Sequence, residues 1–357
     1  NELLSKSDYR RELVTTQSAR TLSTYIYSSC GSGESTTDVI YSGHLINAEN
    51  GKLLKETRNF DFDAHYLISD IDLEKIYNAR LKNSSYGFEQ PAFEYRILKF
   101  NIGDKITDKI YREFSKNPFI THDEDKADDL VREILDFQST ALAKRLLHIN
   151  GKSVVLGISG GLDSTLALIV AQRAFNKLNL DTANIHGLIL PGFGSSDRTN
   201  NNAISLNKQV GVSSKVISIV EAVELHLKDI DHDIEDKSVV YENAQARERT
   251  QILMDYANKM NAIVVGTGDL SEIALGWSTY NADHISMYNV NAGLPKTVIQ
   301  FMIRTIADWE EYSNISEVLK DIVNTPISPE LIPTIDNKIQ DTEQIIGPDE
   351  VHDVILY

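Results

Sequence analysis

One stretch, residues 154–174 (VVLGISGGLDSTLALIVAQRA), constrains the fold more than any other part of the chain. It opens with a short apolar run, Val154 to Leu156, which indicates a buried parallel strand. A Ser-Gly-Gly turn follows, and apolar residues then recur at helical spacing. A strand, a glycine-rich turn and a helix place main-chain N–H groups and a helix N-terminus around one point. We therefore expect an α/β fold with a phosphate-binding turn at this position.

Asp163 follows the two glycines of this turn directly. Its carboxylate would repel a phosphate at contact distance unless a divalent cation lay between them. Ser159 and Ser164 add hydroxyl donors on either side of the turn. The stretch hence predicts a binding site for a metal-bound nucleotide.

Two other phosphate-binding motifs are excluded by spacing. Residues 151–153 read Gly-Lys-Ser, but Leu146 occupies the place of the first glycine of a Walker loop. Segments 192–197 and 266–271 begin Gly-x-Gly but end in Asp and Ser, where a dinucleotide-binding motif has its third glycine. The turn at 159–164 therefore remains the strongest phosphate-binding signal.

Composition narrows the range of partners. The chain has 357 residues, of which 41% are hydrophobic, and this is long enough for two domains. Its net charge of −17 disfavours binding to nucleic acid backbones or to anionic membranes. The single cysteine excludes an internal disulfide framework, and no apolar run approaches the ~20 residues of a membrane span. We expect small-molecule partners, no nucleic acid or membrane partner, and a cytoplasmic location.

The segments before the turn predict a separate N-terminal domain. Alternating apolar residues and the Asn50-Gly51 pair favour a hairpin. We place the domains at 1–115 and 116–357, with a helix at 8–20, a strand at 23–30, a hairpin and further strands over 38–76, and polar, irregular chain over 77–126.

Strands and helices alternate from residue 125 onward, which predicts a parallel, doubly wound sheet covered on both faces. Ligands of such sheets bind at the carboxyl ends of the strands, so the loops at 191–197 and 267–272 should lie beside the glycine turn. We expect helices at 125–149, 198–210, 220–228, 241–260 and 270–276, and strands at 184–190, 215–219 and 262–266.

The SGGLDS turn after an apolar strand resembles the pyrophosphate loop of the N-type ATP pyrophosphatases. Segments 190–203, 241–258 and 266–297 are similar to those of glutamine-dependent NAD synthetases. This resemblance implies a sheet of the adenine nucleotide alpha hydrolase type in residues 116–357. Segment 33–72 resembles the last strands of a nitrilase-like amidase domain, which implies that 1–115 is the C-terminal part of such an α/β sandwich.

The resemblance also implies a set of site residues. Taken alone, Trp277 would more often be a core residue and Lys296 a surface charge, and Arg247 could simply pair with Glu242 or Glu248 on its helix. The expected ATP contacts are Gly157, Ile158, Ser159, Gly160, Gly161, Leu162, Asp163, Ser164 and Thr267; the Mg²⁺ ligands are Asp163 and Glu272; the deamido-NAD contacts are Asn243, Arg247, Glu272, Trp277 and Lys296; and the catalytic residues are Asp163 and Lys296.

The implied reaction is ATP-dependent amidation of deamido-NAD to NAD⁺ through an acyl adenylate, with AMP and pyrophosphate as the other products. The family takes ammonia from glutamine and assembles from dimers, so a homodimer or higher homo-oligomer is expected. Cys30 lies where the family has no nucleophile, which indicates a structural thiol and free ammonia as the nitrogen donor of this chain. The alternatives are a catalytically weak nucleotide-binding fragment or another ATP pyrophosphatase synthetase, such as a tRNA-modifying one, which the negative charge disfavours.

Overall fold

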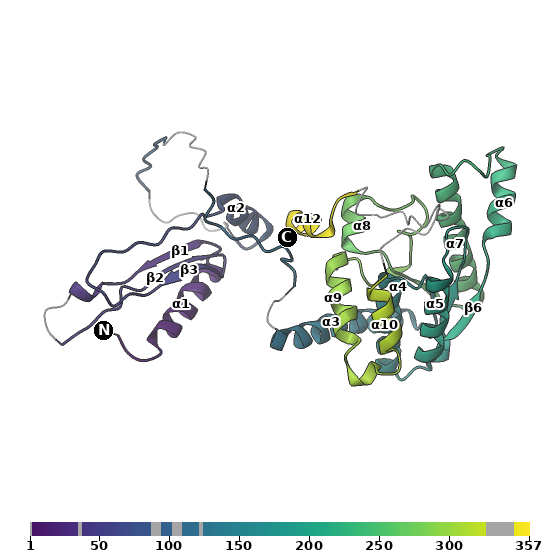
Figure 1. The fold of residues 1–357 in the computed structure, drawn as a ribbon, viewed down its shortest axis with the longest axis horizontal. Coiled ribbons are helices and arrows are strands. Elements are labelled where there is room, and N and C mark those ends of the chain that lie inside the picture. The colour runs from purple at the N-terminus through teal and green to yellow at the C-terminus, as the bar shows by residue number, and fades with distance from the viewer. Residues whose placement is uncertain (1, 35–37, 87–93, 102–108, 121–123, 326–345) are drawn as a thin grey trace. The chain divides into compact units, whose positions relative to one another are not determined.

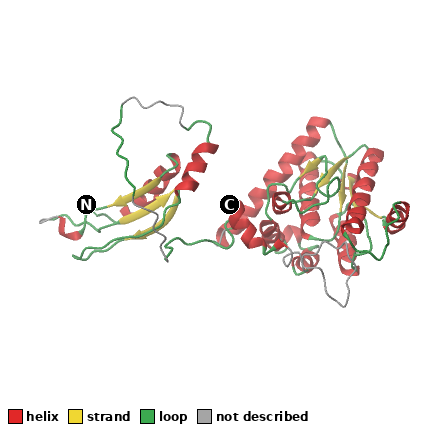
Figure 2. Ribbon diagram, turned by 90° about the horizontal axis from the view of Figure 1, so that it is seen from above, coloured by secondary structure: helices red, strands yellow, loops and turns green. Residues whose placement is uncertain are grey.

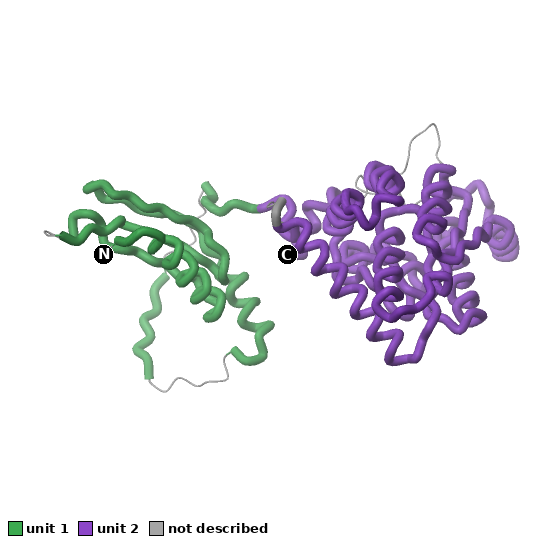
Figure 3. The backbone as a smooth tube through the Cα atoms, turned by 90° about the horizontal axis from the view of Figure 1, so that it is seen from below, with its two compact units in different colours: residues 1–114 green, residues 115–357 purple. Residues whose placement is uncertain are grey.

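The computed structural model describes residues 2–34, 38–86, 94–101, 109–120, 124–325 and 346–357. The chain divides into two compact units, Asn1–Phe114 and Ser115–Tyr357 (Figure 3). In the described part of the chain, none of the helices is long and apolar enough to cross a membrane.

Unit 1 contains a three-stranded antiparallel sheet in the order β1-β2-β3. Its strands are β1 (Thr24–Ser28), β2 (Leu45–Glu49) and β3 (Lys52–Thr57), and α1 (Lys6–Arg20) packs against them (Figure 1). The turn between β2 and β3 is formed by Asn50 and Gly51, whose φ angles of 45° and 86° suit a tight hairpin. A small core of Val14, Ile46 and Ala48 lies between α1 and the sheet.

Two expectations for unit 1 are wrong in detail. Strands do not continue to residue 76 in the described chain, and the segment expected to be irregular contains part of α2 (Leu73–Lys82). Asp72 begins this helix, because its side chain accepts a hydrogen bond from the Lys75 N–H at 2.8 Å. Of the segment that resembles an amidase domain, residues 35–37 lie outside the described residues.

A buried ion pair between Arg112 and Glu49 connects the C-terminal end of unit 1 to its sheet. The Glu49 carboxylate, on β2, accepts two hydrogen bonds from the Arg112 guanidinium at 2.7 and 3.0 Å. It also accepts one from the Asp72 N–H at 2.7 Å, so both its oxygens are paired. The side chain of Glu49 is 2% exposed, which makes this contact costly to break.

Unit 2 is built on a five-stranded parallel sheet in the order β6-β5-β4-β7-β8, which confirms the expected parallel α/β fold. Figure 2 shows this sheet surrounded by helices. The strands are β4 (Val154–Gly157), β5 (Ile185–Ile189), β6 (Ser213–Val216), β7 (Ile263–Gly266) and β8 (Tyr288–Asn289). The first strand, β4, is central, and the chain extends the sheet first on one side of it and then on the other.

Both faces of the sheet are covered, because alternate residues of β4 enter different cores. The helices of unit 2 are α3 (Glu124–Ile149), α4 (Leu162–Leu178), α5 (Asp197–Val210), α6 (Val220–Asp229), α7 (Val239–Met260), α8 (Leu270–Leu275), α9 (Lys296–Ile306), α10 (Ser316–Val323) and α12 (Asp349–Leu356), with short 3₁₀ turns at Thr182–Asn184 and Glu310–Tyr312. Val154 and Leu156 pack in the larger core with α3, α4, α9 and α10, whereas Val155 packs with α6 and α7.

Candidate nucleotide and metal site

The glycine turn joins the carboxyl end of β4 to the start of α4. Gly160 has φ +84°, and a Cβ at this position would lie 2.2 Å from the carbonyl oxygen of Thr199. Only glycine fits both conditions. The Gly161 N–H donates to Ser159 Oγ at 3.2 Å, and Ser159 Oγ lies 3.1 Å from Ser164 Oγ. The turn therefore has a fixed shape, with two hydroxyl groups beside the first residues of a long helix.

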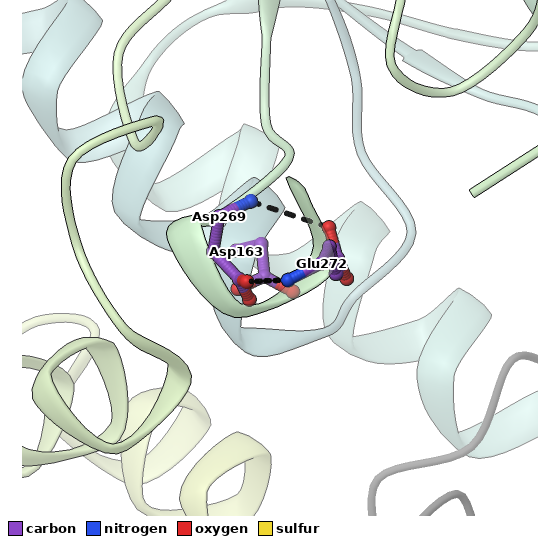
Figure 4. Close-up of side chains that lie close together, drawn as sticks. All are labelled: Asp163, Asp269 and Glu272. Atoms are coloured by element: carbon purple, nitrogen blue, oxygen red, sulfur yellow. Dashed lines mark hydrogen bonds between the residues drawn. The ribbon is translucent and has the colours of Figure 1, made fainter. Parts of the chain in front are cut away.

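Beside this turn, one lysine is surrounded by three carboxylates. Lys296 Nζ lies 2.8 Å from Asp163 Oδ2, 2.6 Å from Asp269 Oδ2 and 2.8 Å from Glu272 Oε1. Figure 4 shows the three acidic side chains together, with Asp163 coming from α4 and the other two from the start of α8. Lys296 is 8% exposed and Asp269 is fully buried, so these charges interact with little screening by water.

This crowding changes the acidity of the groups. Burial disfavours the Lys296 ammonium, but the carboxylates of Asp163, Glu272 and Asp269 outweigh it and hold the lysine pKa well above its usual value. Burial raises the pKa of Glu272 to about 7, because the neighbouring carboxylates reinforce it and Lys296 only partly opposes it. Burial likewise raises the pKa of Asp269. Because burial and mutual repulsion raise these pKa values, one lysine does not fully offset the cost of ionising the neighbouring acids.

Local structure explains how these side chains reach one place. Asp269 begins α8 through a capping box, in which its Oδ1 accepts from the Glu272 N–H at 2.8 Å. Glu272 Oε2 in turn accepts from the Asp269 N–H at 3.2 Å (Figure 4). Lys296 is the first residue of α9, and its N–H donates to the buried Ser271 Oγ at 3.2 Å. The starts of α8 and α9 are therefore tied together at the cluster.

Asp269 was not among the residues expected in the metal site. The D-L-S-E pattern from 269 to 272 is a common helix start, and it accounts for an acidic residue there without any ligand. The structure shows that only Oδ1 caps the helix, while Oδ2 faces Lys296. An aspartate cap at the carboxyl end of a parallel strand is the signal that could have identified it.

The residues fit a hard divalent cation. Asp163, Asp269 and Glu272 each offer one carboxylate oxygen, and these oxygens lie within 4.8 Å of one another. Asp163 Oδ1 is buried and has no hydrogen-bond partner among the described residues. A buried oxygen of this kind is poorly satisfied by the protein alone and suits a ligand or ion.

Two of the expected substrate residues, Asn243 and Arg247, lie together on α7. Asn243 Oδ1 accepts from Thr279 Oγ1 at 2.8 Å, and Arg247 Nε donates to the Tyr280 carbonyl at 3.3 Å. Both residues, one helical turn apart, thus hold the segment that follows Trp277. Trp277 is half-buried, and its main-chain N–H donates a hydrogen bond to the Glu272 carbonyl of α8 at 2.9 Å. His284 contacts the Thr279 carbonyl at 2.9 Å, in line with a structural role.

Cys30 lies in the other unit, where its side chain is exposed. Its carbonyl accepts a hydrogen bond from the Gly43 N–H at 2.8 Å. The sulfur is therefore part of the rim of this unit and not of its core.

The chain is similar to several known proteins. A glutamine-dependent NAD(+) synthetase of Mycobacterium tuberculosis is 37% identical over 366 residues, which are 99% of this chain and 54% of that protein. The chain thus spans about half the length of this relative. A solved structure of NMN synthetase from Francisella tularensis has a TM-score of 0.52 and 25% identity, covering 63% of this chain and 85% of its own.

A solved glutamine-dependent NAD+ synthetase from Acinetobacter baumannii shares the fold, with a TM-score of 0.50 and 18% identity over 91% of this chain and 52% of its own. The family model of NAD synthase matches residues 132–348. This range is more than half of the chain, and it contains the glycine turn, the carboxylate cluster and Lys296. The chain therefore belongs to the NAD synthase family.

Proposed function

We propose that the chain catalyses the ATP-dependent amidation of deamido-NAD to NAD⁺, as the synthetase part of a glutamine-dependent NAD synthetase. One observation carries this proposal: a buried lysine held by three carboxylates next to a glycine turn. A turn of this shape suits the phosphates of ATP, and the cluster supplies both a cation and ligands for a second one. The mycobacterial relative, by its name, is a synthetase of this type.

The ATP phosphates would lie over residues 157–164 and beside Thr267. Asp163 and Glu272 would hold Mg²⁺, with Asp269 as a third acidic neighbour. The ion, when bound, would offset phosphate charge and make the α-phosphorus more electrophilic. Its two positive charges would also balance the acidic excess of the cluster, since one ammonium faces three acids.

The protein groups would then act by position and charge. In the first step the nicotinate carboxylate oxygen bonds to the α-phosphorus of ATP and pyrophosphate leaves, giving an acyl adenylate. In the second, ammonia bonds to the acyl carbon, loses a proton, and AMP leaves. Lys296 would stabilise the charge that develops in the first step. Asn243, Arg247 and Trp277 would orient deamido-NAD, and no protein nucleophile is required.

We infer that unit 1 is the C-terminal part of a nitrilase-like glutaminase domain, and that the protein assembles as a homodimer or higher homo-oligomer. The resemblance of segment 33–72 and the match to nearly the whole chain by the mycobacterial relative support the first inference. Sedimentation equilibrium would test the second. An exposed Cys30 is consistent with a thiol that takes no part in glutamine hydrolysis.

The nitrogen donor provides the first test. With ATP, Mg²⁺ and deamido-NAD, we expect the purified chain to form NAD⁺ from ammonium chloride at pH 8.5 to 9, because more of the ammonia is then unprotonated. Glutamine should support no synthesis, since hydrolysis needs an activated thiolate that Cys30 does not provide. Cys30→Ala should leave the ammonia-dependent rate unchanged.

Glutamine-dependent synthesis that disappears in Cys30→Ala would contradict this assignment of the thiol. Offering nicotinate mononucleotide in place of deamido-NAD, with detection of NMN, would separate the proposed activity from that suggested by the Francisella neighbour. A chain that binds Mg²⁺ and ATP but amidates neither acceptor would be a nucleotide-binding fragment.

The metal ligands provide the second test. Asp163→Asn and Glu272→Gln should each lower the rate of NAD⁺ formation by a factor on the order of 10² to 10⁴, because each removes an anionic oxygen from a hard cation. Activity would be measured over a range of Mg²⁺ concentrations. Glu221→Gln removes an exposed carboxylate from the first turn of α6 and is the matched control. Near wild-type turnover of Asp163→Asn at saturating Mg²⁺ would reject its role as a ligand.

A further inference from the structure

A buried asparagine joins the two chain segments that carry the carboxylates. Asn291, just after β8, is fully buried. Its amide nitrogen donates to the Asp163 carbonyl at 2.9 Å, in the first turn of α4. The same nitrogen donates to the Thr267 carbonyl at 3.1 Å, in the loop between β7 and α8. One side chain therefore bridges the segment that carries Asp163 and the segment that leads to Asp269 and Glu272.

The orientation of this amide is determined by a second buried side chain. Gln138 Nε2, from the middle of α3, donates to Asn291 Oδ1 at 3.1 Å and to the Val290 carbonyl at 2.9 Å. With Oδ1 engaged as an acceptor, the nitrogen of Asn291 must face the two carbonyls. Both donors and the acceptor of the amide are thus satisfied, as a buried amide requires.

A neighbouring asparagine reinforces the connection. Asn289 Oδ1 accepts from the Asn291 N–H at 3.1 Å, and Asn289 Nδ2 donates to the Gly268 carbonyl at 2.8 Å. The loop that leads to α8 is therefore held at two consecutive residues, Thr267 and Gly268. A shift of this loop relative to α4 would break several partly buried hydrogen bonds at once.

We propose that Asn291 is a positioning residue for the reaction, and that it sets the separation between Asp163 and the acidic start of α8. This inference rests on the proposed function, since the separation matters only where both segments act on one metal-bound nucleotide. Asn291 would touch neither substrate nor metal. Its contribution would be to hold the metal ligands in place. A displacement of these ligands by about 1 Å would lower the activity by about a hundredfold.

The experiment compares two fully buried asparagines, each of which donates two hydrogen bonds through its amide nitrogen. Asn207, on α5, is also fully buried, and its amide nitrogen donates to the Gly187 carbonyl at 3.1 Å and to Ser214 Oγ at 3.0 Å. It joins α5 to β5 and β6, and it makes no hydrogen bond to a site residue within the described part of the chain, so Asn207→Ala is the matched control for Asn291→Ala. Gln138→Leu removes the anchor of the Asn291 amide while leaving its two donors in place.

We expect Asn291→Ala to lower kcat for NAD⁺ formation from ammonia by about a hundredfold. The Mg²⁺ concentration that gives half-maximal activity should also rise by about tenfold, because the ligands lose their separation. Asn207→Ala should change neither value by more than about threefold at a temperature where both variants are folded. Gln138→Leu should also lower kcat and raise the required Mg²⁺ concentration, each by a smaller factor than Asn291→Ala. If Asn291→Ala does not fold, Gln138→Leu still tests the proposal.

Equal Mg²⁺ dependence in the Asn291 variant and wild type, or equal losses in the Asn291 and Asn207 variants, would overturn the proposal. Calorimetric binding of ATP with Mg²⁺, without deamido-NAD, separates its failure from that of the proposed function. If wild type binds this nucleotide but makes no NAD⁺, weaker binding by Asn291→Ala than by Asn207→Ala still supports the positioning role. Equal binding by the two variants, or no binding by wild type, rejects it.

Discussion

Lys296→Met is expected to lower the rate of NAD⁺ formation at least about a thousandfold, because it removes the ammonium group that lies between three acidic side chains. The methionine fills a similar volume, so the effect would come from charge and not from a cavity. The measurement is the rate of NAD⁺ formation from ammonia under saturating ATP, Mg²⁺ and deamido-NAD. Lys320→Met is the control, because Lys320 makes an exposed ion pair with Asp308 at 3.0 Å.

The same substitution should make stability depend more strongly on pH. Without the ammonium, the pKa values of Glu272 and Asp269, already raised by burial, rise further. A carboxyl whose folded pKa exceeds its unfolded value stabilises the fold below the unfolded pKa, and this contribution is lost as pH rises through the folded pKa. Lys296→Met should therefore lose stability relative to wild type between pH 5 and pH 8, by about 3 to 5 kcal/mol at the upper end.

Urea unfolding in the presence of EDTA at both pH values would measure this loss without interference from bound metal. Parallel stability curves for wild type and variant between the two pH values would show that the carboxylates do not depend on Lys296. Unchanged activity would remove the lysine from the proposed mechanism.

Gly160→Ala is expected to abolish measurable nucleotide binding and to lower activity by about a hundredfold or more, because the added Cβ would lie 2.2 Å from the Thr199 carbonyl oxygen. This steric clash can be relieved only if the phosphate-binding turn moves away from α5. Gly211→Ala is the matched control, since Gly211 also has a positive φ, +78°, but its nearest neighbour would be 3.9 Å away.

Both alanine variants should lose about 1 to 2 kcal/mol of stability from the left-handed backbone alone. Only Gly160→Ala should lose nucleotide binding, measured by calorimetry with ATP and Mg²⁺. Comparable binding in the two variants would mean that the turn tolerates displacement and does not bind the phosphates.

The strand, turn and helix around Gly160 could be predicted from sequence because adjacent residues determine them. The parallel sheet followed from alternating elements, and this order also placed the loop after β7 beside the turn. Asp269 was not assigned to the metal site, because its local pattern already explains it as a helix cap. Asn291 left no signal at all, because its partner Gln138 is 153 residues away. Contacts of this range depend on the completed fold, and no local spacing reveals them.

α2 illustrates a different limit. Half of its ten residues are polar, and of the apolar ones only Ile76 is buried, so burial does little to determine this helix. The signal that could have identified this helix is the capping residue Asp72, at the end of a segment interpreted as strand. A short surface helix of this kind is determined more by its ends than by its buried face.

The central place of β4 in the sheet also has a consequence for the order of folding. As the chain is made, β4, β5 and β6 can pair while β7 has not yet been synthesised. One edge of β4 therefore remains unpaired until β7 is made, and pairing between strands so distant in sequence is slow. Asp163 is present from the start, but Asp269, Glu272 and Lys296 arrive only with the second half of the sheet. We expect nucleotide binding to be the last property that a newly synthesised chain acquires.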